Sequence, residues 1–249
     1  SHLFENDSFG QSIINHSDCL ECRDRSIDST APDQELFHCE LQPIHEWSNE
    51  ELDYLVKIKE NKNDLKLITF HMASSCSDPI VEKGMFQTGG KTYNRKELLR
   101  NAKINFDEIK RIFGSEIIIA VENNNYYPTD AYEYVTDSDF ISEVVRENDL
   151  GFLFDVAHAK VTSYNKNVNF EKYKSELPLD KIVQVHICSY DINYEEDYAY
   201  DAHNYPNEEE LIEVKKLINN YKTIRYLTVE YYRDIENLEK SLNEVRTLV

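Results

Sequence analysis

The sequence predicts an α/β protein of the (β/α)8 TIM-barrel class. Short apolar runs alternate with longer amphipathic runs, which is typical of repeated βαβ units and a parallel sheet. The length of 249 residues also fits such a barrel, which typically takes ~250 residues. Most apolar runs end in a carboxylate or an imidazole, as expected where strand ends converge on a site. We therefore expect residues 1–249 to form a single TIM-barrel domain.

The expected elements alternate along the chain. The apolar runs predict strands at 19–24, 35–41, 65–71, 116–122, 151–155, 182–187 and 225–230. The amphipathic runs predict helices at 48–62, 94–113, 137–148, 168–176, 207–221 and 234–248. Ser48 and Glu51 form a capping box at the start of one helix, and Gly114 ends the next one. An eighth strand is expected at residues 1–4, which resemble the tail of a strand.

Two long segments, 72–93 and 188–206, are expected to be loops that cover the site. Each follows a strand that ends in a histidine, and the second is rich in Tyr and Asp. Long loops at the carboxyl ends of barrel strands commonly act as substrate lids.

Composition limits the classes of partner. The net charge is −20, from 47 acidic and 27 basic residues, which disfavours nucleic acid and favours metal ions or a cationic partner. No apolar run approaches the ~18 residues of a membrane span, and the first residues lack the apolar segment of a signal peptide. Five scattered cysteines do not resemble a disulfide framework, so we expect reduced thiols and a cytoplasmic location.

Eight side chains capable of binding metal lie at or just beyond the ends of the apolar runs. They are His71, Glu122, Asp155, His158, His186, Asp201, His203 and Glu230. Alternation along each strand places Glu122 on one face with Ala120, and Glu230 with Thr228, as expected for a narrow barrel interior. A lone residue of this kind usually has an ordinary structural role, but the whole series on successive strands indicates a metal site.

The chemistry of this set indicates more than one ion. Four carboxylates brought together repel each other and raise their pKa values unless a cation lies between them. The nearest basic residues in the sequence are Lys160 and Arg233. Mixed histidine and carboxylate ligands suit Zn, Mn or Fe better than Ca or Mg. Eight ligands exceed what one ion takes from protein, so we expect two or three ions.

The order of these motifs resembles the xylose-isomerase-like barrel superfamily. Within it, the chain from Val121 onward most resembles the multinuclear non-haem iron-dependent oxidases. The segments that carry this resemblance are VENNNYY, DFISEVVRENDLGFLFDVAHA, LPLDKIVQVHICS, DAHNYP and LTVEYYR. Together they span about half of the chain. The family also has a histidine on an early strand, for which this chain offers His38, Glu40 or His16 without a clear match.

The resemblance implies a site of two or three irons that activates O2 and oxidises a peptide, usually at a cysteine. A partner protein often holds that peptide. By this resemblance His71 and Glu122 would serve one iron, and Asp155, His186 and Glu230 a second. The third would take His158, Asp201 and His203. The four residues Glu122, Asp155, His186 and Glu230 are the expected catalytic core.

Two other side chains are candidates for binding substrate. Arg233 follows Glu230 by three residues and suits an anionic group. Tyr190 is one of several tyrosines expected around the mouth of the barrel.

Three other functions stay open from the residues. A single-metal sugar isomerase or epimerase, with Mn or another divalent ion, needs only the four core ligands and leaves His158 and His203 without metal roles. A hydrolase of the three-zinc AP-endonuclease type uses nearly the same ligands. It calls for basic loops, however, whereas 188–206 contains no Lys or Arg. A binding module without catalysis would not explain four convergent carboxylates.

Overall fold

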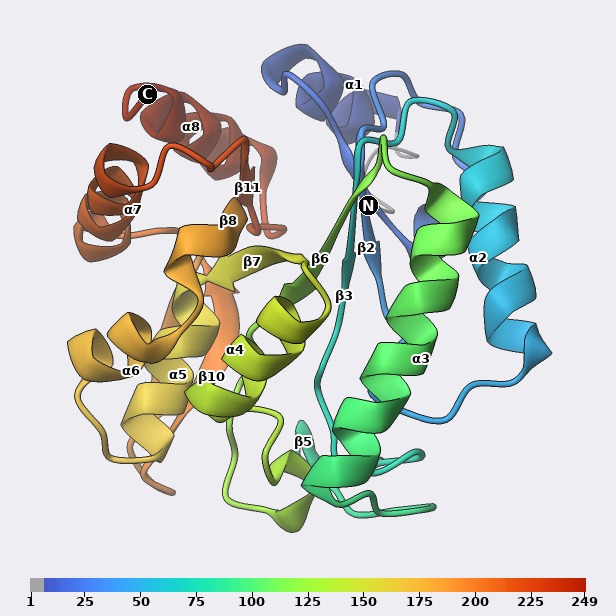
Figure 1. Ribbon diagram of the computed structural model, residues 1–249. Coiled ribbons are helices and arrows are strands. Elements are labelled where there is room, and N and C mark those ends of the chain that lie inside the picture. Colours follow the sequence, from blue (N-terminus) through green and yellow to red (C-terminus); the bar gives the residue numbers. More distant parts are fainter. Residues whose placement is uncertain (1–6) are drawn as a thin grey trace.

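The computed structural model describes residues 7–249 (Figure 1). Seven parallel strands form the main sheet, in the order β1-β2-β3-β6-β7-β8-β11. Their bounds are β1 Glu21–Arg23, β2 Leu36–Cys39, β3 Leu67–Phe70, β6 Ile118–Glu122, β7 Gly151–Asp155, β8 Ile182–Ile187 and β11 Tyr226–Val229. The sheet curls into a nearly closed barrel, which confirms the predicted fold class.

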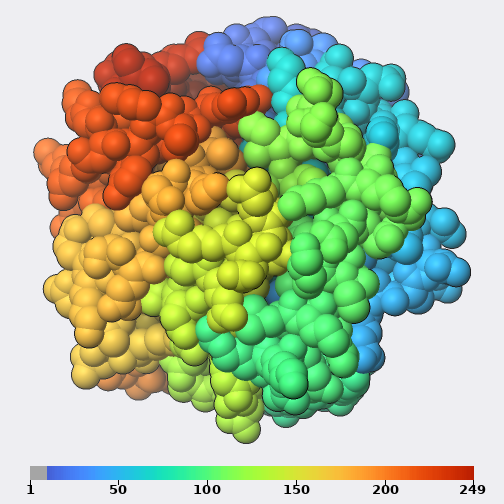
Figure 2. All heavy atoms as spheres, in the orientation of Figure 1, coloured from blue at the N-terminus to red at the C-terminus, as the bar shows by residue number. Residues whose placement is uncertain are grey.

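Helices lie outside the sheet, as Figure 1 shows for α2 and α3 along one flank. Their bounds are α1 Asp7–His16, α2 Asn49–Asn61, α3 Arg95–Phe113, α4 Ser138–Glu147, α5 Val156–Asn165, α6 Phe170–Glu176, α7 Glu208–Asn220 and α8 Ile235–Arg246. Short 3-10 turns occur at Asp24–Ser26, Asp130–Tyr132 and Leu179–Lys181. The expected capping box of Ser48 and Glu51 forms at the start of α2, and Gly114 ends α3 with φ of 77°. Helices α1 and α8 pack together, so the N-terminal and C-terminal segments adjoin on the surface (Figure 2).

Two hairpins occupy the segments that the sequence predicts as loops. β4 (Ile80–Glu82) pairs antiparallel with β5 (Met85–Gln87), and β9 (Ser189–Asn193) pairs with β10 (Tyr198–Asn204). Lys83 and Gly84 form the turn of the first hairpin with positive φ angles of 50° and 79°, the conformation that two-residue hairpin turns require. The prediction of loops at 72–93 and 188–206 was therefore wrong over these strands, although both hairpins do reach the ligand end of the barrel.

Alternation along the strands separates two environments. On β8, Val185 and Ile187 are fully buried in the main apolar core, together with Phe152 and Phe154 of β7. The alternate side chains point into the barrel, where Gln184 donates hydrogen bonds to Glu21 and Thr228. A polar layer therefore fills the barrel directly beneath the ligand-bearing strand ends.

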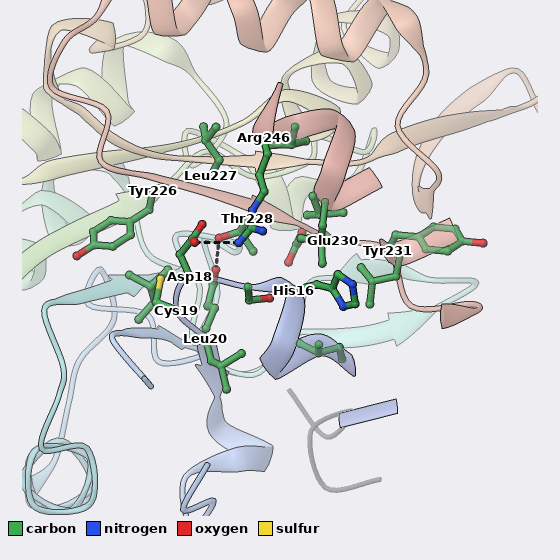
Figure 3. Close-up of a pocket in the computed structure, with 18 of the residues that line it drawn as sticks. His16, Asp18, Cys19, Leu20, Tyr226, Leu227, Thr228, Glu230, Tyr231 and Arg246 are labelled. Atoms are coloured by element: carbon green, nitrogen blue, oxygen red, sulfur yellow. Dashed lines mark hydrogen bonds and ion pairs between the residues drawn. The ribbon is translucent and has the colours of Figure 1, made fainter. Parts of the chain in front are cut away.

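The barrel is open between β1 and β11. Among the described residues, neither strand pairs on its outer edge. A cavity of about 330 Å³ lies there, lined by Cys19 and Leu20 on one side and Tyr226 and Thr228 on the other (Figure 3). The predicted eighth strand, at residues 1–4, lies outside the described residues. Within the part of the chain that the structure covers, no helix is long and apolar enough to cross a membrane.

Candidate metal centre

The candidate ligands converge at the carboxyl end of the barrel. Glu122 and Asp155 are the last residues of β6 and β7, and His186 lies near the end of β8. His71 and Glu230 directly follow β3 and β11. Parallel strands bring their carboxyl ends to one rim, so residues far apart in sequence meet there.

The first group of ligand atoms joins the early strands to β6. Nε2 of His38 lies 3.4 Å from Oε2 of Glu122, and Nε2 of His71 lies 3.7 Å from the same oxygen. The two imidazole nitrogens also contact each other directly. The three side chains lie close enough to share one ion. Of the three candidates that the sequence left open, His38 is the one that lies beside these ligands, since Glu40 is exposed and His16 belongs to α1.

The second group lies around His186 at the centre. Its Nδ1 is 3.3 Å from Oε1 of Glu122, 3.4 Å from Oε2 of Glu230 and 3.8 Å from Oδ2 of Asp155. Oε1 of Glu122, Oδ2 of Asp155 and Nδ1 of His186 are buried without a hydrogen-bond partner. Buried polar atoms rarely lack partners. Three such atoms facing one another therefore fit a cation held between them.

The third group combines α5 with β10. Nε2 of His158 is 3.4 Å from Oδ2 of Asp201, which is 3.2 Å from Nε2 of His203. Asp155 caps α5 by accepting from the His158 amide, and Nδ1 of His158 donates to the Asn123 carbonyl. This last bond fixes the tautomer of His158 and leaves its Nε2 available to a metal.

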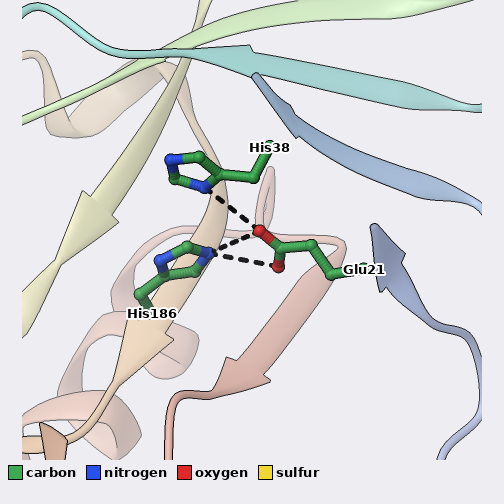
Figure 4. Close-up of side chains that lie close together, drawn as sticks. All are labelled: Glu21, His38 and His186. Carbon is green, nitrogen blue, oxygen red and sulfur yellow. Dashed lines mark hydrogen bonds and ion pairs between the residues drawn. The ribbon is translucent and has the colours of Figure 1, made fainter. Parts of the chain in front are cut away.

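Glu21, on β1, lies beneath the two central imidazoles (Figure 4). Its Oε1 accepts from Nδ1 of His38 and from Nε2 of His186, each at 3.1 Å. The opposite ring nitrogens, Nε2 of His38 and Nδ1 of His186, are those that face the other ligands. A carboxylate behind a histidine is the usual way in which metalloproteins fix the tautomer and orientation of a ligand.

An arginine also reaches the site. The Arg23 guanidinium forms an ion pair with Oε1 of Glu230, and the Tyr232 hydroxyl donates to the same oxygen at 3.0 Å. The second oxygen of Glu230 faces His186 and His203. The basic side chain that offsets the charge of the carboxylates is therefore Arg23 of β1. It is not Lys160, which pairs with Glu210, and it is not Arg233.

Burial and mutual charge shift the pKa values of these groups strongly. Burial raises the pKa of Asp155 to about 7, and repulsion from Glu122 adds to this although His158 opposes it. Burial lowers the pKa of His71 to about 3, with a further contribution from His38. For His158 and His186 burial acts downward, but the surrounding carboxylates outweigh it and hold both pKa values well above the usual range. Such concentrated perturbation is typical of functional sites.

These shifts predict a pH dependence of metal binding. His158, His186 and Asp155 hold protons in the metal-free protein because their pKa values are raised. A metal ion must displace those protons, so its affinity should rise with pH, about tenfold per pH unit for each proton released. Zinc competition titrations with a chelator between about pH 6 and about pH 8 measure this slope. A pH-independent affinity would contradict the assignment.

A cavity of about 320 Å³ opens onto the ligands. Phe86 and Gly84 of the first hairpin form part of its wall, together with Tyr127 and Tyr132. It adjoins a hollow of about 800 Å³ under the β9–β10 hairpin, and the two share Gly84, Tyr127 and Asp201. Aromatic side chains, among them Phe86, Tyr127 and Tyr198, therefore line much of the space beside the ligands.

The two predicted substrate-binding residues do not line these spaces. Arg233 is exposed and donates to the Ala202 carbonyl on β10, and the Tyr190 ring lies against Lys160. By contrast, sequence reasoning did not single out Glu21, Arg23 or Cys188. A signal for the first two was available, because Glu21 and Arg23 alternate with Leu20 and Cys22 on a predicted strand and so face the barrel interior.

Comparison with known families identifies the group to which the chain is related. The model of the family described as "RiPP precursor modification enzyme MbnB/TglH/ChrH" matches residues 92–249. The chain belongs to this family. The match includes β6 to β11 and therefore all but the earliest ligands, His38 and His71, and the supporting Glu21. The description of the family names enzymes that modify precursors of RiPPs, which are ribosomally made, post-translationally modified peptides.

Curated relatives of this family member are distant. The UPF0276 protein of Acaryochloris marina is 21% identical over 155 residues, covering 62% of the chain and 54% of the relative. The UPF0276 protein of Shewanella loihica is 27% identical over 107 residues, covering 43% of the chain and 37% of the relative. The chain thus matches about half or less of the length of these relatives.

Solved structures support the barrel. A D-tagatose 3-epimerase-like protein superposes with a TM-score of 0.57 at 18% identity, covering 99% of this chain and 94% of that one. D-psicose 3-epimerase of Clostridium cellulolyticum gives 0.56 at 12% identity, with coverage of 96% and 89%. At these identities the similarity shows the fold, an α/β barrel, and not the reaction.

Proposed function

We propose that this chain is a multinuclear non-haem iron-dependent oxidase that oxidises a ribosomally made peptide, with a cysteine as the modified residue. The observation that carries the proposal is the two-sided use of Glu122. One oxygen faces His38 and His71, and the other faces His186. A carboxylate whose oxygens serve two groups of imidazoles suits a bridge between two ions, which a single-metal isomerase does not need.

The donor set supports iron. Imidazoles and carboxylates suit iron, manganese and zinc, and only a redox-active metal serves an oxidation. Iron, when bound, would supply electrons to dioxygen and take them from the substrate. His38, His71 and Glu122 would hold one ion and Glu122, Asp155 and His186 a second, with His158, Asp201 and His203 as the ligands of a third. Manganese or zinc is the alternative occupant, and zinc would rule out the oxidation because it has no redox chemistry.

The chain itself contributes binding, orientation and exclusion of water. Glu21 holds protons on the outward nitrogens of His38 and His186, so that their inward nitrogens keep lone pairs for metal. Arg23 neutralises one oxygen of Glu230 and leaves the other directed at His186 and His203. The walls formed by Phe86, Tyr127 and Tyr132 limit the access of water to the ligands.

A peptide substrate fits the space above the metal centre better than a nucleic acid. The larger hollow is lined by tyrosines, two carboxylates and one lysine, Lys83, and the chain carries a net charge of −20. Phosphate backbones are repelled by such a surface. A partner protein that presents the peptide is part of the proposal. We further propose that Arg233 and Tyr190 contact this peptide or its partner at the rim, outside the cavity.

Metal content and two alanine variants test the proposal. Protein produced with added iron and purified without oxygen is expected to hold two or three irons per chain. His158→Ala and His203→Ala should each lower that number by about one ion and abolish oxygen-dependent peptide oxidation, because each removes a ligand of the third group. His16→Ala is the matched control. His16 lies on α1, where its ring contacts Ser12 and Glu239 and not a proposed ligand, so its loss should leave the iron content unchanged.

Other outcomes would redirect the assignment. One manganese, magnesium or zinc ion per chain, with both histidine variants fully loaded, would overturn the multinuclear proposal and favour a sugar isomerase. Three zinc ions and phosphodiester cleavage would favour a hydrolase instead.

A further inference from the structure

Cys188 is placed unlike the other buried cysteines. It directly follows β8, and alternation puts it on the same inward face as Gln184 and His186. Among the described residues, buried Cys22 and Cys39 pack in the main apolar core and Cys76 packs in a smaller one, whereas Cys188 belongs to none of the apolar clusters. Its side chain is nevertheless fully buried.

Carboxylates surround the Cys188 thiol. Its sulfur lies 3.6 Å from Oδ1 of Asp201. Ligand atoms of Asp155, Cys188 and Glu230 all lie within 4.8 Å of one another, which is close enough for one ion. Oδ2 of Asp155 is fully buried without a hydrogen-bond partner, whereas the other oxygen accepts from the His158 amide. This is the same oxygen that faces His186 in the second group, so a cation held there would adjoin Cys188.

We propose that Cys188 is a metal ligand, so that one position of the centre has a carboxylate–thiolate donor set of Asp155, Cys188 and Glu230. Coordination breaks the S–H bond, releases the proton to solvent and directs a sulfur lone pair to the metal, without any change of oxidation state. A soft thiolate favours iron, cobalt or zinc over magnesium and manganese. The inference rests on the proposed metal centre and adds a sulfur ligand to the histidines and carboxylates that sequence indicates.

Cobalt substitution tests this directly, with a readout that does not depend on catalysis. Metal-free protein loaded with cobalt(II) to full occupancy is expected to show a strong near-ultraviolet band from sulfur-to-cobalt charge transfer. Cys188→Ser should lose the band while it retains most of its cobalt, since the carboxylates and histidines are unchanged. Cys76→Ser is the matched control and should keep the band, because Cys76 contacts Ser74 and not the ligands. A band that persists in Cys188→Ser would overturn the proposal.

A second measurement needs only the wild-type chain, so it tests the proposal even if Cys188→Ser does not fold. X-ray absorption of the zinc-loaded protein should show a sulfur neighbour at about 2.3 Å. Its absence would exclude Cys188 as a ligand. The oxidase proposal is tested separately from the role of Cys188. A sulfur neighbour without oxygen-dependent peptide oxidation would support Cys188 as a ligand and overturn the proposed reaction. Oxidation without a sulfur neighbour would support the reaction and overturn the role of Cys188.

Discussion

Glu122→Gln is expected to remove most of the metal from the centre and to abolish oxidation. Glutamine has almost the same shape, but it replaces one anionic oxygen by an NH2 group that cannot bind a cation. Both oxygens of Glu122 face imidazoles, so the change affects the group with His38 and His71 and the group with His186 together. We expect affinity at these positions to fall by at least about 100-fold, beyond the ~10–100-fold typical of losing an outer partner.

The same variant should retain metal at the third group. Nε2 of His158 faces Asp201, and Asp201 faces His203, whereas Glu122 lies 3.7 Å from the other ring nitrogen of His158. Elemental analysis should therefore find about one remaining ion per chain in Glu122→Gln. Glu116→Gln, at an exposed position before β6, is the matched control and should be fully loaded. Full metal content in Glu122→Gln would refute the role of Glu122 as a bridge.

The strands were predictable because their chemistry is local. Each of the seven predicted strands forms within two residues of its expected ends, since apolar runs between turn signals leave few alternatives. The ligands could be predicted for a related reason. One carboxylate at a strand end, such as Glu122 after the run IIIAV, can have a structural role, but carboxylates and imidazoles at the ends of successive strands indicate a shared site.

Two helices and two hairpins escaped prediction because their patterns lack a clear period. Helix α5 (Val156–Asn165) is buried over most of its surface, so VAHAKVTSYN shows no alternation of apolar and polar faces. The strands β9 and β10 are half-exposed and rich in tyrosine and acidic residues, which resembles a loop. Helix α1 is short and mixed in polarity. In each case tertiary contacts, and not local preference, decide the conformation.

The role of Glu21, which supports two of the histidines, could not be predicted from the sequence for another reason. Glu21 lies in CLECR, where a single acid in a short strand resembles an ordinary surface residue. Glu21 is near His38 because β1 pairs with β2, but only the curling of the sheet brings it to His186 of β8 as well. Alternation could indicate that Glu21 faces inward, but no sequence pattern indicates which histidines it supports.

Glu21→Gln is therefore expected to weaken metal binding, although Glu21 contacts the ring nitrogens that point away from the other ligands and is not itself a proposed ligand. The carboxylate accepts hydrogen bonds from Nδ1 of His38 and Nε2 of His186, and these bonds hold both rings with the opposite nitrogens toward the metal. The amide has a single acceptor oxygen and an NH2 group that repels a ring N–H. Either ring can then turn or take the other tautomer. The expected loss is ~10–100-fold in metal affinity.

The pH profile distinguishes this positioning role from a merely structural one. Glu21 helps to raise the pKa values of His38 and His186, in opposition to burial. In Glu21→Gln those values should fall, so fewer protons compete with the metal and the increase of affinity with pH should become shallower. Glu35→Gln, at a half-buried carboxylate that pairs with Lys66 outside the barrel interior, should keep the wild-type slope. Chelator competition at several pH values measures both quantities, and a Glu21→Gln protein with unchanged affinity and slope would show that the carboxylate only fills space beneath the metal centre.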